Sequence, residues 1–151
     1  MKYDNKILEK IYILDLALKE LNREPLLNNG DLNIDELTSG LYLKLNLKRG
    51  VHVPRLSIMI SPFEFLIDLD RIGEAYAYSH EQFLVHTENV KSQFKTLLTS
   101  TIKIVYCGSH YTKAYFFDSA GNCVGKIREI TGLYLKIGCT SKEYPPIYPN
   151  Y

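Results

Sequence analysis

A strictly alternating run at residues 41–48 is the feature that most constrains the fold. Leucine stands at every second position, and tyrosine, lysine or asparagine stands between the leucines. Successive side chains of an extended chain point to opposite faces. The run therefore predicts a half-buried strand, with Leu41, Leu43, Leu45 and Leu47 on its inner face.

Further strand candidates follow on both sides of a central helical region. Residues 56–60 lie between Pro54 and Pro62. In residues 63–70 apolar side chains again stand at every second position. In the latter segment Phe63, Phe65, Ile67 and Leu69 would lie on one face, and Glu64, Leu66, Asp68 and Asp70 on the other. Near the C-terminus the pattern predicts a four-strand meander at residues 102–107, 112–118, 123–130 and 133–137.

Two segments have the apolar spacing of helices. Residues 4–22 repeat apolar side chains at intervals of three and four, with Asp4 as a cap and Pro25 beyond the end. Ser79 opens the second helix with Gln82 three residues later, which fits a capping box, and Ser100 or Thr101 would end it. The buried stripe of this second helix would be Phe83, Thr87, Val90, Phe94 and Leu97.

Residues 26–40 have the composition of a loop, because Asn28-Asn29-Gly30-Asp31 is turn chemistry. Asp31 to Asp35 imitates the first half of a calcium-binding loop. Glu36 and Tyr42 stand where that loop needs glycine and glutamate, so we expect no calcium site.

Together these elements predict one α+β domain over residues 1–151, with two helices packed on a mostly antiparallel sheet in the order helix, strands, helix, four-strand meander. The chain has 151 residues, 46% of them hydrophobic, and a net charge of +1, which excludes intrinsic disorder. No apolar run is long enough to span a membrane, and the first residues lack the apolar stretch of a signal peptide. Residues 141–151, rich in proline and tyrosine, would form an extended tail.

The cysteines, Cys107, Cys123 and Cys139, are odd in number and evenly spaced. Their spacing matches no zinc motif, so we expect no metal. An odd count without a leader indicates reduced thiols and a location in the cytoplasm.

Charge is unevenly distributed although the total is nearly balanced. Between residues 64 and 88 six carboxylates stand against Arg71 alone, a local excess of −5. Tyrosine, with 12 residues and no tryptophan, is the other outlier, and it is favoured at protein interfaces. The two features predict a surface that binds a basic protein partner, formed by Glu64, Asp68, Asp70, Glu74, Tyr76 and Tyr78.

A second interpretation of the sequence is a metal-dependent enzyme that uses Asp68 and Asp70. On one strand face their carboxylates would be close enough to hold a divalent metal with His80 or His86 nearby, as in a small hydrolase. A solvated acidic face explains the same pattern, and no cofactor motif or phosphate-binding glycine loop occurs. The cluster Cys107-Gly108-Ser109-His110 places a thiol, a hydroxyl and an imidazole close in sequence, which is the composition of a polar turn rather than of a triad. We therefore expect a protein that is not an enzyme and needs no cofactor.

A third interpretation rests on basic and aromatic residues of the C-terminal strands. Such residues interleaved on a sheet can bind single-stranded nucleic acid. The signature of the common sheet-type RNA binders is absent. The residues concerned are Lys103, Lys113, Lys126, Arg128 and Lys136 with Tyr106, Tyr111, Tyr115 and Tyr134.

In overall build the chain resembles the small immunity proteins of bacterial polymorphic-toxin and contact-dependent growth inhibition systems. The resemblance rests on an amphipathic N-terminal helix (Asp4 to Asn22), an acidic central segment (Phe63 to Glu88) and a tyrosine-rich late hairpin (Tyr115 to Val124). It implies a non-enzymatic cytoplasmic protein that neutralises one cognate toxin, often a basic nuclease, by covering its active site. It assigns no role to a single residue.

Overall fold

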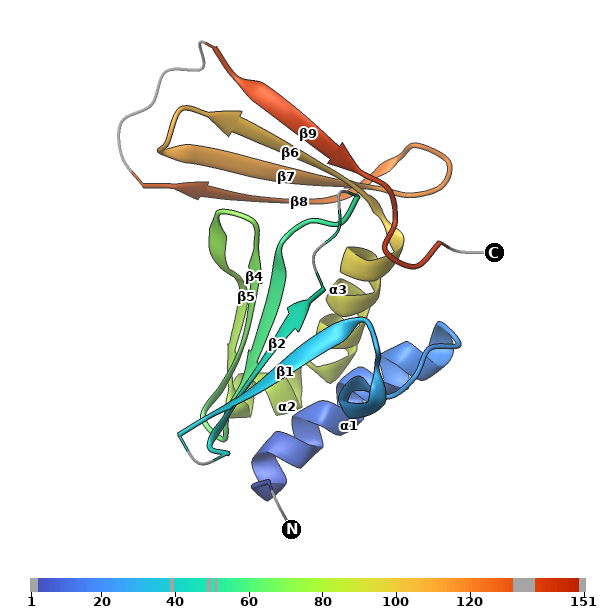
Figure 1. Ribbon diagram of the computed structural model, residues 1–151, viewed down its shortest axis with the longest axis vertical. Coiled ribbons are helices and arrows are strands. Elements are labelled where there is room, and N and C mark those ends of the chain that lie inside the picture. Colours follow the sequence, from blue (N-terminus) through green and yellow to red (C-terminus); the bar gives the residue numbers. More distant parts are fainter. Residues whose placement is uncertain (1–2, 39, 49, 51, 132–137, 150–151) are drawn as a thin grey trace.

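The computed structural model describes residues 3–38, 40–48, 50, 52–131 and 138–149. The elements follow one another from an N-terminal helix through two groups of strands (Figure 1). In order they are α1 Asn5–Glu20, η1 Leu26–Asn28 (a 3-10 helix), β1 Leu32–Leu37, β2 Tyr42–Leu47, β3 Leu56–Ile60, β4 Glu64–Leu69, β5 Ile72–Ser79, α2 His80–Val85, α3 Thr87–Thr99, β6 Thr101–Cys107, β7 Tyr111–Phe117, β8 Cys123–Ile130 and β9 Thr140–Tyr144.

The α+β class is confirmed, but the strands form two antiparallel sheets rather than one. The first sheet has five strands in sequence order, β1 to β5. The second has four strands in the order β8-β7-β6-β9, so the last strand returns to pair with β6. Strands β6, β7 and β8 pair in sequence order as the meander predicts, and β9 adds a strand at the start of the predicted tail, which gives the described strands the order of a Greek key.

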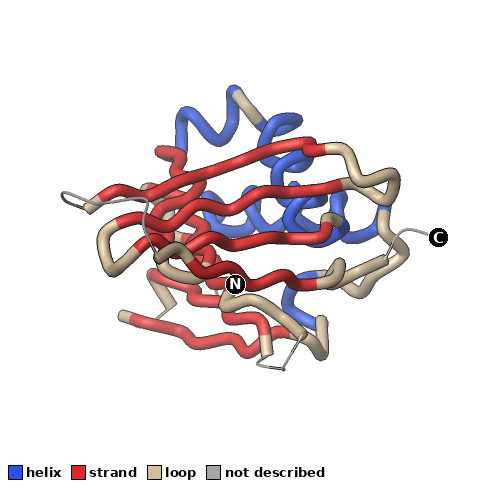
Figure 2. Tube along the Cα trace, turned by 90° about the horizontal axis from the view of Figure 1, so that it is seen from above, coloured by secondary structure: helices blue, strands red, loops and turns tan. Residues whose placement is uncertain are grey.

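The helices cover one face of the five-stranded sheet, and the four-stranded sheet lies across one end of that assembly (Figure 1). Figure 2 looks onto the four-stranded sheet, with the helices behind it. One connected apolar core joins the helices to the inner faces of both sheets. Each sheet therefore keeps one face for solvent, as antiparallel sheets commonly do.

The first helix and the strands β2 and β3 form where the sequence predicts them. The side chain of Asp4 accepts a hydrogen bond from the Lys6 N–H and caps α1. On β2, Leu43, Leu45 and Leu47 are buried as predicted and the residues between them are partly exposed, whereas Leu41 precedes the strand and is exposed. The apolar alternation is therefore a reliable signal in this part of the chain.

The sequence patterns do not predict two of the strands. Strand β1 lies inside the segment that the sequence pattern predicts to be a loop. The pattern misses it because β1 is an edge strand with no buried residue, so its sequence shows no apolar alternation. Strand β5 contains Gly73, two alanines and an irregular register opposite Ile67 to Leu69, so its alternation is weak. Both strands are held by pairing with a strong neighbour rather than by their own pattern.

The predicted second helix begins with the expected capping box at Ser79 and ends at Ser100, but it is divided in two at His86. His86 has φ −111° and ψ 32°, outside the helical region. The β-branched residues Val85 and Thr87 flank it and have low helix propensity. Of the predicted stripe, Phe83, Val90, Phe94 and Leu97 are buried, and Thr87, next to the break, is only partly buried.

The strand predicted at residues 63–70 is shorter than expected at both ends. Phe63 precedes β4 and is 62% exposed instead of facing the core. Asp70 lies in the two-residue turn between β4 and β5, with φ 55°. Aspartate tolerates this left-handed conformation better than most residues.

The C-terminal segment lies across the domain. Its first residues pair with β6 as strand β9, and Tyr144 and Tyr148 are both buried. The fourth predicted strand, residues 133–137, lies outside the described residues.

The expectation of three reduced thiols is wrong for two of them, because Cys107 and Cys139 form a disulfide. They stand directly opposite each other just beyond the last pair of β6 and β9, Tyr106 and Thr140. Cys123 is free and exposed. Among the described residues, no helix is long and apolar enough to cross a membrane.

Candidate binding surfaces

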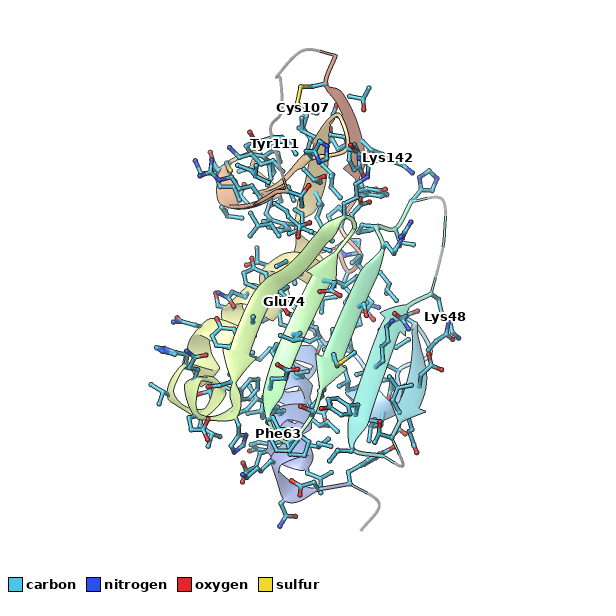
Figure 3. The ribbon with its side chains drawn as sticks, turned by 90° about the vertical axis from the view of Figure 1, so that its left-hand side faces the viewer. Lys48, Phe63, Glu74, Cys107, Tyr111 and Lys142 are labelled. Atoms are coloured by element: carbon cyan, nitrogen blue, oxygen red, sulfur yellow. A yellow bond between two sulfur atoms is a disulfide. The ribbon has the colours of Figure 1, made fainter. Side chains whose placement is uncertain are left out.

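The outer face of the five-stranded sheet is uncovered, and it carries part of the predicted acidic surface (Figure 3). Glu64 and Asp68 point outward from β4, because the residues that alternate with them are buried. Glu74 lies on the same face, where it lines a shallow concavity of about 220 Å³ together with Glu64, Leu66 and Ala77. Three of the four predicted carboxylates thus share one sheet face.

Asp68 and Glu74 are tied together by the bulge in β5. The backbone N–H of Glu74 donates to Oδ1 of Asp68 at 2.7 Å, and Glu74 has φ 49°. The register between β4 and β5 shifts at this point. The irregularity directs the Glu74 side chain out over the sheet beside Asp68.

An apolar row runs between the carboxylates. Met59 pairs with Leu66 across β3 and β4, and Leu66 pairs with Ala77 on β5. Phe63, just before β4, adds an exposed aromatic ring beside Glu64. The sequence patterns do not single out these residues as functional, although Met59 and Leu66 occupy outward positions of alternating strands.

The remaining predicted residues do not point out from this face, although Tyr78 also borders the 220 Å³ concavity. Tyr76 and Tyr78 pair with Ile67 and Phe65, whose side chains are buried, so both tyrosines lie on the helix-covered face. The Tyr78 hydroxyl donates to Oε1 of Gln93 on α3 at 2.6 Å. Burial raises the pKa of Tyr76. Tyr78 therefore ties α3 to the sheet, and Tyr76 is partly buried on the same face.

Asp70 lies at the junction of the two sheets. Its Oδ2 accepts a hydrogen bond from the Tyr106 hydroxyl at 2.8 Å, and its Oδ1 accepts from the Arg71 N–H at 2.8 Å. Burial and the adjoining Asp70 carboxylate raise the pKa of Tyr106. Asp70 therefore joins β6 to the β4–β5 turn and does not stand beside Asp68 on a strand face.

This placement weakens the metal-hydrolase interpretation. The Asp68 carboxylate accepts from Glu74 and the Asp70 carboxylate accepts from Tyr106, so each has a structural partner. Among the described residues, no three histidine, cysteine or carboxylate side chains are grouped as metal ligands. Cys107 is bonded to Cys139, so it offers no thiol to the neighbouring His110.

A cleft of about 350 Å³ opens at the same junction and is lined by Arg55, Arg71 and Lys142 among other residues. Two of these cations are already engaged. The Arg71 guanidinium lies 4.6 Å from the Tyr106 ring centroid and donates to the Gly108 carbonyl, and the Lys142 ammonium lies 5.1 Å from the Tyr144 ring centroid. At this cleft two cations pack on tyrosine rings where the two sheets meet, so these side chains have a structural role.

The outer face of the four-stranded sheet is basic and aromatic. Cross-strand partners share a face, and two such rows are Lys103–Tyr115–Lys126 and Val105–Lys113–Arg128. Phe117 follows Tyr115 on the same face. Of the nine residues in the third interpretation, Lys103, Lys113, Tyr111, Tyr115, Lys126 and Arg128 share this face. Tyr106 points inward to Asp70, and Tyr134 and Lys136 lie outside the described residues.

No protein-family model, no curated protein and no solved structure matches the chain.

Proposed function

We propose that this protein is a non-enzymatic protein-binding module of the immunity type, which neutralises a cognate toxin by binding it through the outer face of the five-stranded sheet. The partner is a basic protein, such as a nuclease, whose active cleft is lined by lysine and arginine. This surface, the acidic sheet face, consists of Glu64, Asp68, Glu74, Phe63, Met59, Leu66 and Ala77.

The observation that carries the proposal is the arrangement of charge around an apolar row. Met59, Leu66 and Ala77 run across three strands, and the carboxylates of Glu64, Asp68 and Glu74 flank them. An apolar centre with a charged rim is the usual anatomy of a protein interface. Phe63, which is 62% exposed and adjoins Glu64, offers a large aromatic side chain of a kind that is enriched at protein interfaces.

The acidic rim favours fast association. Carboxylates on one face accelerate the encounter with a basic protein, and salt screens this effect over about 8 to 10 Å. Glu81 and Glu88, on α2 and α3, are exposed but belong to the helical layer on the other side of the sheet. The charge that acts on the partner is therefore carried mainly by three residues rather than by the whole segment of residues 64–88.

A capture experiment with charge-reversed variants tests the proposal. Glu64→Lys with Glu74→Lys changes two rim positions and leaves intact the Asp68 carboxylate that accepts from the backbone. The control, Glu24→Lys with Glu88→Lys, makes the same change in net charge at exposed positions away from the acidic sheet face. We expect a basic protein from the native lysate to bind the unchanged chain and the control but not the rim variant.

The identified partner then allows a kinetic test. Its association rate should fall with rising salt, and the rim variant should lose that dependence. A partner that binds the rim variant at an unchanged rate in low salt would remove the acidic sheet face from the proposal. A toxin domain encoded in a neighbouring reading frame is the first partner to test.

A cytoplasmic location belongs to the same proposal, because an immunity protein of this type meets its toxin there. The Cys107–Cys139 disulfide weighs against it, since such bonds persist mainly in oxidising compartments. Thiol trapping in intact cells decides between the two: reduced thiols support the cytoplasm, and an oxidised pair contradicts it.

A further inference from the structure

We propose that the outer face of the four-stranded sheet, opposite to the acidic sheet face in its chemistry, binds single-stranded nucleic acid. The basic sheet face is defined by Lys103, Lys113, Tyr115, Phe117, Lys126 and Arg128. The proposal rests on different residues from the proposed function and does not depend on it.

Two aromatic rings lie at the centre of the basic sheet face. Tyr115 and Phe117 are two residues apart on β7, and their ring centroids are 6.4 Å apart with an interplanar angle of 23°. Both side chains are partly exposed, whereas Ala114 and Phe116, which alternate with them, are fully buried in the core. The two rings stack on each other, and the part of them that is exposed offers aromatic surface against which a base can pack.

Four cations surround these rings. Lys103 and Lys126 are the cross-strand partners of Tyr115 on either side. Lys113, two residues before Tyr115 on β7, pairs with Arg128 on β8. The Lys113 ammonium lies 4.8 Å from the Tyr115 ring centroid. None of the four side chains forms an ion pair with a described carboxylate.

The acids of this sheet offset the four cations only in part. Glu129 belongs to the inner face, where its Oε2 accepts from the Gly73 N–H at 3.4 Å. Glu143 is the cross-strand neighbour of Lys103. Among the described residues of strands β6 to β9, it is the one carboxylate whose position in the strand alternation places it on the basic sheet face. A surface with this excess of cations attracts phosphates.

Two concavities flank the rings. One, of about 360 Å³, is lined by Lys113, Lys126, Arg128 and Ile127 and suits a phosphate. The other, of about 440 Å³, is lined by Lys103, Phe117 and the carboxylates of Asp118 and Glu143, and it offers both donors and acceptors to a base edge. A single strand can place its backbone in the first and a splayed base in the second, which a stacked duplex cannot do.

Fluorescence anisotropy of a labelled RNA of about 12 nucleotides and mixed sequence tests the inference with the full chain. Lys126→Glu with Arg128→Glu should weaken binding by at least about tenfold and should lower the salt slope by about 0.7 for each phosphate that the variant no longer neutralises. Lys6→Glu with Lys19→Glu, at exposed positions of α1, makes the same change in net charge and should bind normally.

Variants of Tyr115 separate stacking from charge. Tyr115→Ala should weaken binding about 5- to 150-fold. Tyr115→Phe should bind as the unchanged chain does, because stacking against a base needs the aromatic ring and not the hydroxyl. A duplex of the same sequence should bind at least about tenfold more weakly than the single strand. Circular dichroism confirms that each variant is folded.

Three results would overturn the inference. The first is no binding of the RNA at low salt. The second is equal affinity for single strand, duplex and heparin with no effect of Tyr115→Ala, which indicates a general polyanion surface. The third is binding to vesicles of anionic lipid that outcompetes the RNA, which indicates a membrane surface.

Discussion

The ammonium nitrogen of Lys10 lies 2.7 Å from Nδ1 of His80, inside the layer between α1 and α2. Lys10 has no exposed surface, and its ammonium also donates to the Lys6 carbonyl at 3.2 Å. Because a lysine ammonium can only donate, Nδ1 of His80 acts as the acceptor when Lys10 is charged, and the ring proton then lies on Nε2, 3.5 Å from the Glu9 carboxylate. Burial lowers the pKa of Lys10 to about 8.

The lowered pKa of Lys10 predicts that the protein becomes more stable as pH rises above 8. Between pH 8 and pH 10 the unfolded chain keeps the Lys10 proton and the folded chain releases it, so unfolding takes up a proton. The free energy of unfolding should rise by about 2 to 3 kcal/mol over this range. Urea unfolding at several pH values measures it.

Lys10→Met should remove that rise and should make the protein more stable at pH 7, because the buried ammonium, which is costly to desolvate, is replaced by an apolar side chain. Lys19→Met, at an exposed position near the other end of the same helix, should leave the rise unchanged. Equal pH profiles for Lys10→Met and the unchanged chain would show that Lys10 remains charged in the fold.

The Cys107–Cys139 disulfide predicts a loss of stability on reduction. It closes a loop between residues 32 positions apart, and such a constraint on the unfolded chain contributes about 2 to 4 kcal/mol. Cys107→Ser with Cys139→Ser should lower the free energy of unfolding by that amount and should make stability independent of a reducing agent. Cys123→Ser, at the exposed free thiol, should change neither property. An unchanged midpoint of unfolding in reducing buffer would contradict the prediction.

The capping box at Ser79 predicts a smaller loss. Its hydroxyl oxygen accepts from the Gln82 N–H at 3.1 Å, and the Gln82 side chain accepts from the Ser79 N–H at 2.9 Å. Ser79→Ala should therefore reduce the free energy of unfolding by about 1 kcal/mol. Ser92→Ala, on the exposed side of α3, should stay within about 0.5 kcal/mol of the unchanged chain.

Local sequence patterns predict those elements whose stability is itself local. The leucines of β2 and the Ser79 capping box are predictable because periodicity and caps act within a few residues. Strand β1 and the disulfide are not, because both depend on segments brought together by the fold. A strand at the sheet edge needs little apolar alternation of its own.

The acidic surface shows the same limit at a finer scale. Alternation predicts that Glu64 and Asp68 share one face. The turn at Asp70 and the bulge at Glu74 depend on backbone conformations with positive φ, which the sequence pattern does not predict. The register of β5 puts Tyr76 and Tyr78 on the face opposite to the predicted one. A shift of one residue moves every side chain of a strand to the opposite face.

Tyr148 anchors the C-terminal segment to the first half of the chain. Its hydroxyl donates to Oδ2 of Asp31 at 2.7 Å and lies 3.2 Å from the Asn29 amide nitrogen, and the Arg23 guanidinium lies 4.3 Å from its ring centroid. Burial and the Asp31 carboxylate raise the pKa of Tyr148 to about 12. Tyr148→Phe should lower the free energy of unfolding by about 1 to 3 kcal/mol, because Asn29 is buried and loses a partner.

Tyr144→Phe is the matched control for Tyr148→Phe. Tyr144 is also buried, but its hydroxyl forms no hydrogen bond with a described residue, so its removal should cost less than about 0.5 kcal/mol. Both variants keep the ring, and Tyr148→Phe keeps the backbone bond from residue 148 to the Leu98 carbonyl. Equal losses for the two variants, measured by urea unfolding at pH 7, would mean that the hydroxyl of Tyr148 does not hold the segment and that ring burial alone does.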